Sequence, residues 1–280
     1  MPPARGAREA LTDGVWWRKM QGRLLVRLSS PEKVRNAMLV LLSAAAGCVD
    51  AVSYLGLGHI FTANMTGNTV LLGLSLGQAD WQAALRSGVA LVGFVSGVAF
   101  GTVIAGGDRE GRAVWPIMVT VTLAFELAVL AAFALGLYLA GGASHTLILL
   151  AALAMGLQST AVRRLGIPGV ATTYITGTLT TVIDGAISRL YLVIFSAAMS
   201  DERGERRSKQ ATTSARGLVL PAGVWFAYAI GAVTAGALEF RWPPGGLVPA
   251  VAMVALVVVF SAAGFRRRGG GHEQGPAEER

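Results

Sequence analysis

Long apolar runs, separated by short polar or basic segments, dominate the chain. A run of about 18 or more apolar residues can cross the roughly 30 Å hydrocarbon core of a bilayer as one helix, and several such runs occur here. The pattern predicts spans at about residues 36–56, 60–78, 84–106, 115–140, 145–162, 170–192, 217–239 and 246–264. The second and fifth of these runs are short, so we expect six to eight spans and favour eight. The sequence predicts an all-α, polytopic transmembrane helix bundle.

Composition supports this fold class. Of the 280 residues, 53% are apolar and 14% are charged, whereas soluble domains carry about 25% charged residues. The chain divides into a basic N-terminal arm (1–35), a transmembrane domain (36–265) and a Gly- and Glu-rich tail (266–280) that is predicted to be disordered. The arm is either a basic amphipathic helix in the headgroup region or a disordered segment.

The basic residues predict the topology. They are concentrated in the arm, in the segment 201–216 and at the start of the tail, at Arg266–Arg268. The positive-inside rule places these three segments, and so both termini, in the cytoplasm of a bacterial inner-membrane protein. With eight spans, the segments with fewer basic residues lie on the opposite side; these contain Arg109 and Arg112, Arg163 and Arg164, and Arg241.

Two segments of the chain are similar to each other. Leu55-Gly56 is followed ten residues later by Thr66-Gly67, and Leu165-Gly166 is followed at the same interval by Thr176-Gly177. The next span in each half carries an aromatic residue and spaced glycines, which are Phe94, Gly97 and Gly101 in one and Tyr228, Gly231 and Gly236 in the other. This pattern predicts two repeated halves, about 36–140 and 145–264. With four spans each, the halves would run parallel across the membrane.

Two acidic residues lie within apolar runs. An acidic side chain at mid-membrane costs about 2.5–3.5 kcal/mol on insertion scales, so it normally faces a cavity or a partner. Asp50 lies in the first run, and Glu126 lies in the middle of the fourth with no basic residue close to it in the same helix. Asp50 is a candidate for solute binding, and either carboxyl could couple transport to protons or ions. The alternative for Asp50 is a place near the end of its span, where its cost is small.

The most unusual polar stretch is Asn64-Met-Thr-Gly-Asn68. A helix break at Gly67 would free backbone groups, and the side chains of Asn64, Thr66 and Asn68 could satisfy them or coordinate a small polar solute. Thr176 and Gly177 occupy the equivalent place in the second half. The alternative is that these residues hydrogen-bond between closely packed helices.

Other function classes find little support. The basic residues behind the net charge of +8 are concentrated in the segments that set the membrane topology, which argues against nucleic-acid binding. His59, His145, His272 and Cys48 are scattered without metal-ligand spacing, so neither a metal nor a cofactor is expected. Hydrolase, metalloprotease and phosphate-loop motifs are absent from the sequence, and we expect the chain not to be an enzyme.

The motifs resemble those of the YoaK family of bacterial inner-membrane proteins. The resemblance rests on Ala46–Gly56, Phe61–Thr69 and Thr173–Thr178 and covers roughly residues 36–265. It implies a multi-pass membrane protein but no substrate.

Two functions are compatible with these observations. The leading hypothesis is a small-solute permease or transporter, in which the two Thr-Gly segments line a central site. The rival is a membrane scaffold or accessory subunit whose basic segments dock a partner protein or anionic lipid. Membrane lipids are expected partners in both, and the sequence does not fix the oligomeric state.

Overall fold

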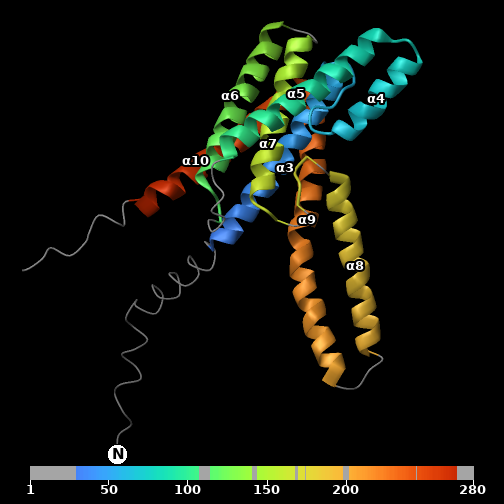
Figure 1. The fold of residues 1–280 in the computed structure, drawn as a ribbon, viewed down its shortest axis with the longest axis vertical. Helices are drawn as coiled ribbons and strands as arrows, with labels where there is room; N and C mark the ends of the chain where they lie inside the picture. The colour runs from blue at the N-terminus through green and yellow to red at the C-terminus, as the bar shows by residue number, and fades with distance from the viewer. Residues whose placement is uncertain are drawn as a thin grey trace, which may run out of the picture. The chain divides into compact units, whose positions relative to one another are not determined.

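The computed structural model describes residues 30–106, 114–140, 144–167, 170–173, 175–197, 202–243 and 245–269. Every regular element in these ranges is helical (Figure 1): α3 (Pro31–Gly56), α4 (Met65–Gly77), α5 (Trp81–Ala105), α6 (Ile117–Ala140), α7 (His145–Arg164), α8 (Ile175–Ala197), α9 (Glu202–Arg241), the 3-10 turn η1 (Gly245–Leu247) and α10 (Val248–Gly269). Most of the predicted arm and tail lie outside the described residues.

Six of the described helices are long and apolar enough to cross a membrane: α3, α5, α6, α7, α9 and α10. This is the lower end of the predicted range of six to eight. Helix α4 has 13 residues, and at 1.5 Å per residue it is about 20 Å long, too short for the hydrocarbon core. It begins at Met65, so the break in the second apolar run lies before this residue and not at Gly67, which is in the first turn of the helix.

The chain divides into two units, Met1–Ala37 and Met38–Arg280. The described part of the first unit consists of residues 30–37, which include the first turns of α3. The packing described below belongs to the second unit.

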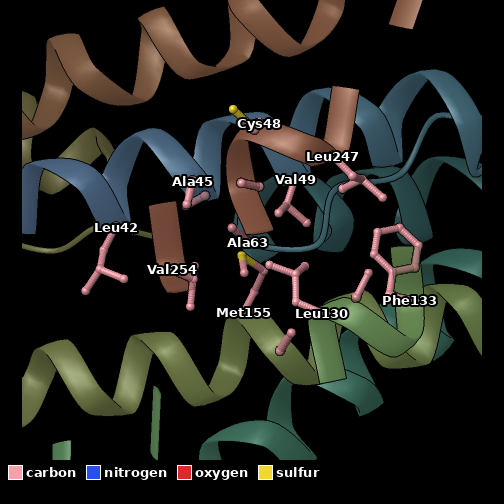
Figure 2. Close-up of a cluster of buried hydrophobic side chains, with 14 of the residues drawn as sticks. Leu42, Ala45, Cys48, Val49, Ala63, Leu130, Phe133, Met155, Leu247 and Val254 are labelled. Carbon is pink, nitrogen blue, oxygen red and sulfur yellow. The ribbon is translucent and has the colours of Figure 1, made fainter. Parts of the chain in front are cut away.

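Helices α3 and α7 form the centre of the second unit. Their buried faces meet in a cluster that includes Val49 and Met155, and this cluster also takes in Phe133 of α6 and Val254 of α10 (Figure 2). Helices α5, α6, α9 and α10 expose large apolar side chains instead; Val103 and Val233, for example, are 80% and 73% exposed. Such an apolar outer surface is suited to lipid rather than to water.

Helices α3 and α9 touch backbone to backbone and run in the same direction. A Cβ on Gly47 would lie 2.1 Å from the carbonyl oxygen of Tyr228, and a Cβ on Gly231 would lie 2.1 Å from that of Ala44. Earlier along both helices, the Ser43 hydroxyl donates to the carbonyl of Val224 over 2.8 Å. Because the contacts advance together along both chains, the helices are parallel.

Helices α5 and α7 make the same kind of crossing. A Cβ on Gly97 would lie 2.1 Å from the carbonyl oxygen of Leu153, and one on Gly156 would lie 2.3 Å from that of Phe94. These contacts also advance together along both helices, from Gly93 with Leu149 to Gly101 with Thr160. Helices α5 and α7 are therefore parallel, and the first helix of each half packs against the third helix of the other half.

The helix ends decide how α3 and α7 run relative to each other. Val52, near the end of α3, abuts Gly246 just before α10, where an added Cβ would lie 2.7 Å from a Val52 methyl group. Tyr138, near the end of α6, lines a hollow together with Val248 at the start of α10. Since α7 follows α6 after the short connection 141–144, α7 begins where α3 ends. The two central helices are antiparallel.

The halves α3–α6 and α7–α10 are thus inverted relative to each other, and the parallel arrangement predicted from the sequence is wrong. That prediction assumed four full spans per half, whereas α4 is too short to cross. We call the end of the bundle where α3 finishes the Gly56 end and the opposite end the Arg163 end. The prediction that Arg163 and Arg164 lie opposite the start of the first span is also wrong, because antiparallel α3 and α7 place them at the same end as Met38.

Candidate functional site

Each central helix is followed by a segment that folds back toward the middle of the bundle. After α3, the chain turns at Gly58 and His59, whose φ angles of 83° and 62° lie in the left-handed region. It then returns along the last turns of α3 until α4 begins at Met65. Asn64 caps α4, since its side-chain oxygen accepts from the Gly67 N–H over 3.3 Å. We call residues 57–64 the first return segment; the described residues 165–167 and 170–173, which follow α7, form the second.

Asp50 holds the first return segment in place. Its Oδ1 accepts from the backbone N–H groups of Thr62 (2.7 Å) and Ala63 (2.6 Å), and its Oδ2 accepts from that of Asn64 (3.2 Å). The hydroxyl of Tyr228, from α9, donates to Oδ2 as well. All these partners are donors, which suits a carboxylate that can only accept.

The Asp50 cluster is closed to the surroundings. Asp50 is 3% exposed, while Thr62 and Asn68 are fully buried. The hydroxyl of Thr62 lies 3.2 Å from that of Ser53, one turn further along α3 than Asp50. Asp50 lies six residues before the end of α3, so the return segment reaches about 9 Å into the bundle.

A second contact fixes the start of α4, and it has a counterpart in α8. The side chain of Asn68 accepts from the backbone N–H of Phe61 over 2.9 Å and donates to the carbonyl of the same residue. In the second half, the hydroxyl of Thr178 donates to the carbonyl of Ala171 over 3.3 Å. Both contacts join residues seven positions apart, so the Thr-Gly alignment made from the sequence also aligns these bonds.

The second return segment is held differently. Gln158 of α7 is fully buried, and its amide donates to the hydroxyl of Thr172 and to the carbonyl of Leu42, both over 3.0 Å. Its own carbonyl oxygen has no hydrogen-bond partner within the described structure. Thr172 is the counterpart of Thr62 in the Thr-Gly alignment. A carboxylate therefore holds one return segment, and an amide holds the other.

Two cavities lie near the end of α7, and the second return segment lines one of them. One, of about 380 Å³, is lined by Ser159, Val162, Arg163 and residues 170–173. The other, of about 620 Å³, lies between α5 and α7 and is lined by residues that include Phe94, Ser159, Arg163 and Arg164. Both cavities include the exposed Arg163, so they lie at the Arg163 end of the bundle.

The candidate residues from the sequence fall into separate places. Asp50 and Asn68 belong to the buried cluster that holds the first return segment. Thr66 and Thr176 are exposed, and Gly67 and Gly177 are half-buried, in the first turns of α4 and α8. The two Thr-Gly steps therefore do not line one central cavity. Asn64 serves as a helix cap, although its backbone N–H does contact Asp50.

Glu126 lies apart from this cluster. It is fully buried on α6, and neither of its carboxyl oxygens has a hydrogen-bond partner among the described residues. It is not hydrogen-bonded to Asp50, whose donors come from the first return segment and Tyr228. A role for Glu126 in proton coupling stays a prediction.

Several contacting residues were not singled out from the sequence. Tyr228 was noted as part of the repeat pattern, and its partner Asp50 lies 178 residues away, a pairing that no local pattern reveals. Thr172 begins the polar stretch 172–178 that the sequence marks as the equivalent of Asn64–Asn68, whereas Ser159 is an ordinary small polar residue in its helix. Aligning the two halves at Gly47 and Gly156 was the signal that could have drawn attention to Ser159.

Comparison with known proteins matches this sequence to a described family. A family model described as "Protein of unknown function (DUF1275)" matches residues 38–260. The chain belongs to this family. It is 38% identical over 228 residues to the UPF0700 transmembrane protein YoaK of Bacillus subtilis (strain 168), an alignment that covers 79% of this chain and 94% of that protein. No solved structure gives a significant match. Membership of the DUF1275 family supports a multi-pass membrane protein and assigns no solute.

Proposed function

We propose that this membrane protein transports a small solute by alternating access between its two inverted halves. The observation that carries the proposal is the asymmetry of the two return segments. Asp50 and Tyr228 close the first one against α3, whereas the second lines a cavity of about 380 Å³. A further cavity of about 620 Å³, between α5 and α7, shares Ser159 and Arg163 with it. Inverted repeats with interrupted helices near the midplane are a common plan of secondary transporters. In such a protein, exchanging the conformations of the two halves moves the opening from one face to the other.

Charge supports one orientation in the membrane. Helices α5 and α7 end at the Arg163 end, and the spanning part of α9 starts there, so Arg163, Arg164 and the first part of α9 (202–216) adjoin this end. Among the described basic residues of the second unit, Arg86 and Arg241 lie at the Gly56 end. By the positive-inside rule, the Arg163 end faces the cytoplasm of the bacterial inner membrane. Six spans satisfy this rule better than the eight favoured from the sequence.

Alternating access can be tested without knowing the solute. Cys48 is the single cysteine of the sequence, so a Cys48→Ala chain provides a background for single-cysteine variants. Ser53→Cys places a thiol beside the first return segment, where Ser53 is fully buried. We expect a membrane-impermeant maleimide added on the Gly56 side of sealed vesicles to label this thiol within minutes to hours, because the segment opens periodically.

Ser43→Cys provides the matched control. Ser43 is also fully buried on α3, but in the crossing with α9, and should stay unlabelled until the protein is denatured. If Ser53→Cys reacts as slowly as Ser43→Cys, the transport proposal fails and the scaffold function is favoured.

The scaffold function has its own supporting observation, namely the concentration of basic segments at one end. Each Lys or Arg near an anionic leaflet contributes about 1 kcal/mol of binding. A scaffold predicts retention of anionic lipid or of a partner protein with no exchange between the two halves. The Ser53→Cys experiment therefore separates the two functions.

A further inference from the structure

The two return segments present the same backbone groups to different surroundings. In the first, the N–H groups of Thr62 and Ala63 donate to the carboxylate of Asp50. Thr172 and Thr173 occupy the matching positions in the second segment, as fixed by the Asn68–Phe61 and Thr178–Ala171 contacts. Neither of their N–H groups donates a hydrogen bond to any described residue. The second half therefore has a set of donors without the acceptor that the first half supplies.

Ser159 takes the position of Asp50. Asp50 lies three residues after Gly47, which abuts the carbonyl of Tyr228, and Ser159 lies three residues after Gly156, which abuts the carbonyl of Phe94. The aromatic residues correspond as well, but Phe94 has no hydroxyl that could donate as Tyr228 does. In the second half, a shorter side chain on α7 stands in place of the carboxylate, and an apolar ring on α5 stands in place of the tyrosine that donates to it.

The space beside Ser159 is a cavity of about 380 Å³, lined by Ser159, Arg163, Thr172 and Thr173 among others. Its lining thus includes the residues that correspond to Asp50, Thr62 and Ala63 of the first half. Arg163 adds a positive charge to it. Paired N–H donors with a nearby guanidinium are a favourable setting for an oxyanion. In the first half, the oxyanion is a side chain of the protein; the second half has room for one from solution.

We propose that the cavity at Ser159 binds a small carboxylate, whose oxygens accept from the N–H groups of Thr172 and Thr173 while Arg163 supplies the balancing charge. This inference rests on the proposed transport function, because it names the class of solute that enters from the Arg163 end. The ligand class follows from the internal template, in which a carboxylate occupies the same donors. The solute carboxylate would thus take, in the second half, the place that the Asp50 carboxylate takes in the first. Asp50 itself does not bind the solute.

The direct test uses the full-length protein in nanodiscs and monocarboxylates from acetate and propionate to benzoate. Saturation-transfer NMR, which detects weak ligands, should report binding of these anions but not of propionamide, a neutral molecule of nearly the same shape as propionate. Sodium chloride at equal ionic strength controls for general salt effects. Equal signals from propionate and propionamide would overturn the proposal, as would tighter binding of inorganic phosphate than of any carboxylate.

Two substitutions at one position sharpen the test. Ser159→Asp places a carboxylate where the first half has Asp50, so it should occupy the donors, abolish binding of added carboxylate and raise the thermal midpoint of unfolding. Ser159→Asn has a similar size without the charge, and should leave the midpoint within a degree or two of the original protein. Retained carboxylate binding in a folded Ser159→Asp protein would contradict the site.

Arg163 and Arg164 provide a matched pair of charge changes. Arg163 lines the proposed site, whereas Arg164 is part of the lining of the neighbouring cavity only. Arg163→Gln should weaken carboxylate binding about tenfold or more, as expected for loss of a charge-assisted contact. Arg164→Gln removes the same charge and should change binding less than about threefold. Equal losses in the two variants would mean that general electrostatics, and not this site, attracts the anion.

These outcomes are separable from the fate of the transport proposal. Carboxylate binding without labelling of Ser53→Cys would leave the anion site in place and overturn alternating access. Labelling of Ser53→Cys without any carboxylate binding would leave alternating access in place and overturn this ligand class.

Discussion

The two halves of the bundle share their backbone contacts and differ in their polar side chains. Gly47 and Gly231 bring α3 against α9, and Gly97 and Gly156 bring α5 against α7 at the same closeness. At the two return segments, by contrast, Asp50 of α3 corresponds to Ser159 of α7 when the halves are aligned at their glycine crossings, Gly47 and Gly156. A duplicated fold can change its buried polar groups at one end while its glycine crossings are kept, because a crossing admits no side chain whereas a cavity admits several.

At the glycine crossings, substitutions should affect the two halves alike. Disrupting a crossing should cause the largest loss of stability. Gly97→Val and Gly231→Val each place Cβ about 2.1 Å from a carbonyl oxygen, which no side-chain adjustment relieves. We expect each variant to lose about 3 kcal/mol or more of stability, seen as aggregation in fluorescence-detected size-exclusion chromatography. Gly236→Ala, where the added Cβ meets nothing within 4 Å, is the control. A monodisperse, wild-type-like Gly231→Val protein would contradict the crossing.

The two halves should differ most at the equivalent positions of Asp50 and Ser159. Asp50→Asn keeps the shape but turns an acceptor-only group into one that also donates toward the N–H groups of Thr62 and Ala63. We expect a loss of about 3 kcal/mol and faster proteolysis within 57–64. Ser159→Ala should cost less than about 0.5 kcal/mol, since no described residue hydrogen-bonds to its hydroxyl. Thermal unfolding in one detergent measures both, and similar losses would refute the contrast.

Tyr228 and Phe94 give a smaller and more local contrast. Tyr228→Phe removes one hydroxyl donor from the Asp50 carboxylate and leaves the three N–H donors in place. Hydrogen bonds inside membrane proteins average about 0.6 kcal/mol and reach about 1.7, and a charged acceptor favours the upper part of this range. We therefore expect a loss of about 1 kcal/mol for Tyr228→Phe in urea or thermal unfolding. Phe94→Tyr should change stability by less than about half of that, because no carboxylate faces it.

Much of the fold could be predicted from the sequence. The apolar runs placed the helices to within a few residues at most ends, because the thickness of the membrane dictates their length and composition. The inverted orientation of the two halves could not be predicted this way. A 13-residue helix after Asn64 reads as a short apolar run, and whether such a run crosses or turns back depends on where its preceding loop is held. Here Asp50 holds that loop about 9 Å inside the bundle, so the chain turns back.

The candidate site was predicted only in part. Asp50 and Asn68 stood out because polar residues are rare in apolar runs, and both belong to the buried cluster of the first half. Thr66 and Thr176 were chosen by the same rule and are exposed. Composition marks a residue as unusual, but it does not say which face of the helix carries it.

The sequence by itself determined the helical membrane architecture, the alignment of two related segments and the unusual place of Asp50 in an apolar run. Only the tertiary structure decided that the halves are inverted, that Asp50 holds a return segment and that Thr172 and Thr173 in the other half line a cavity together with Arg163. The reason is physical. Hydropathy is a property of each segment alone, whereas the Asp50–Tyr228 contact arises when two segments 178 residues apart are packed together.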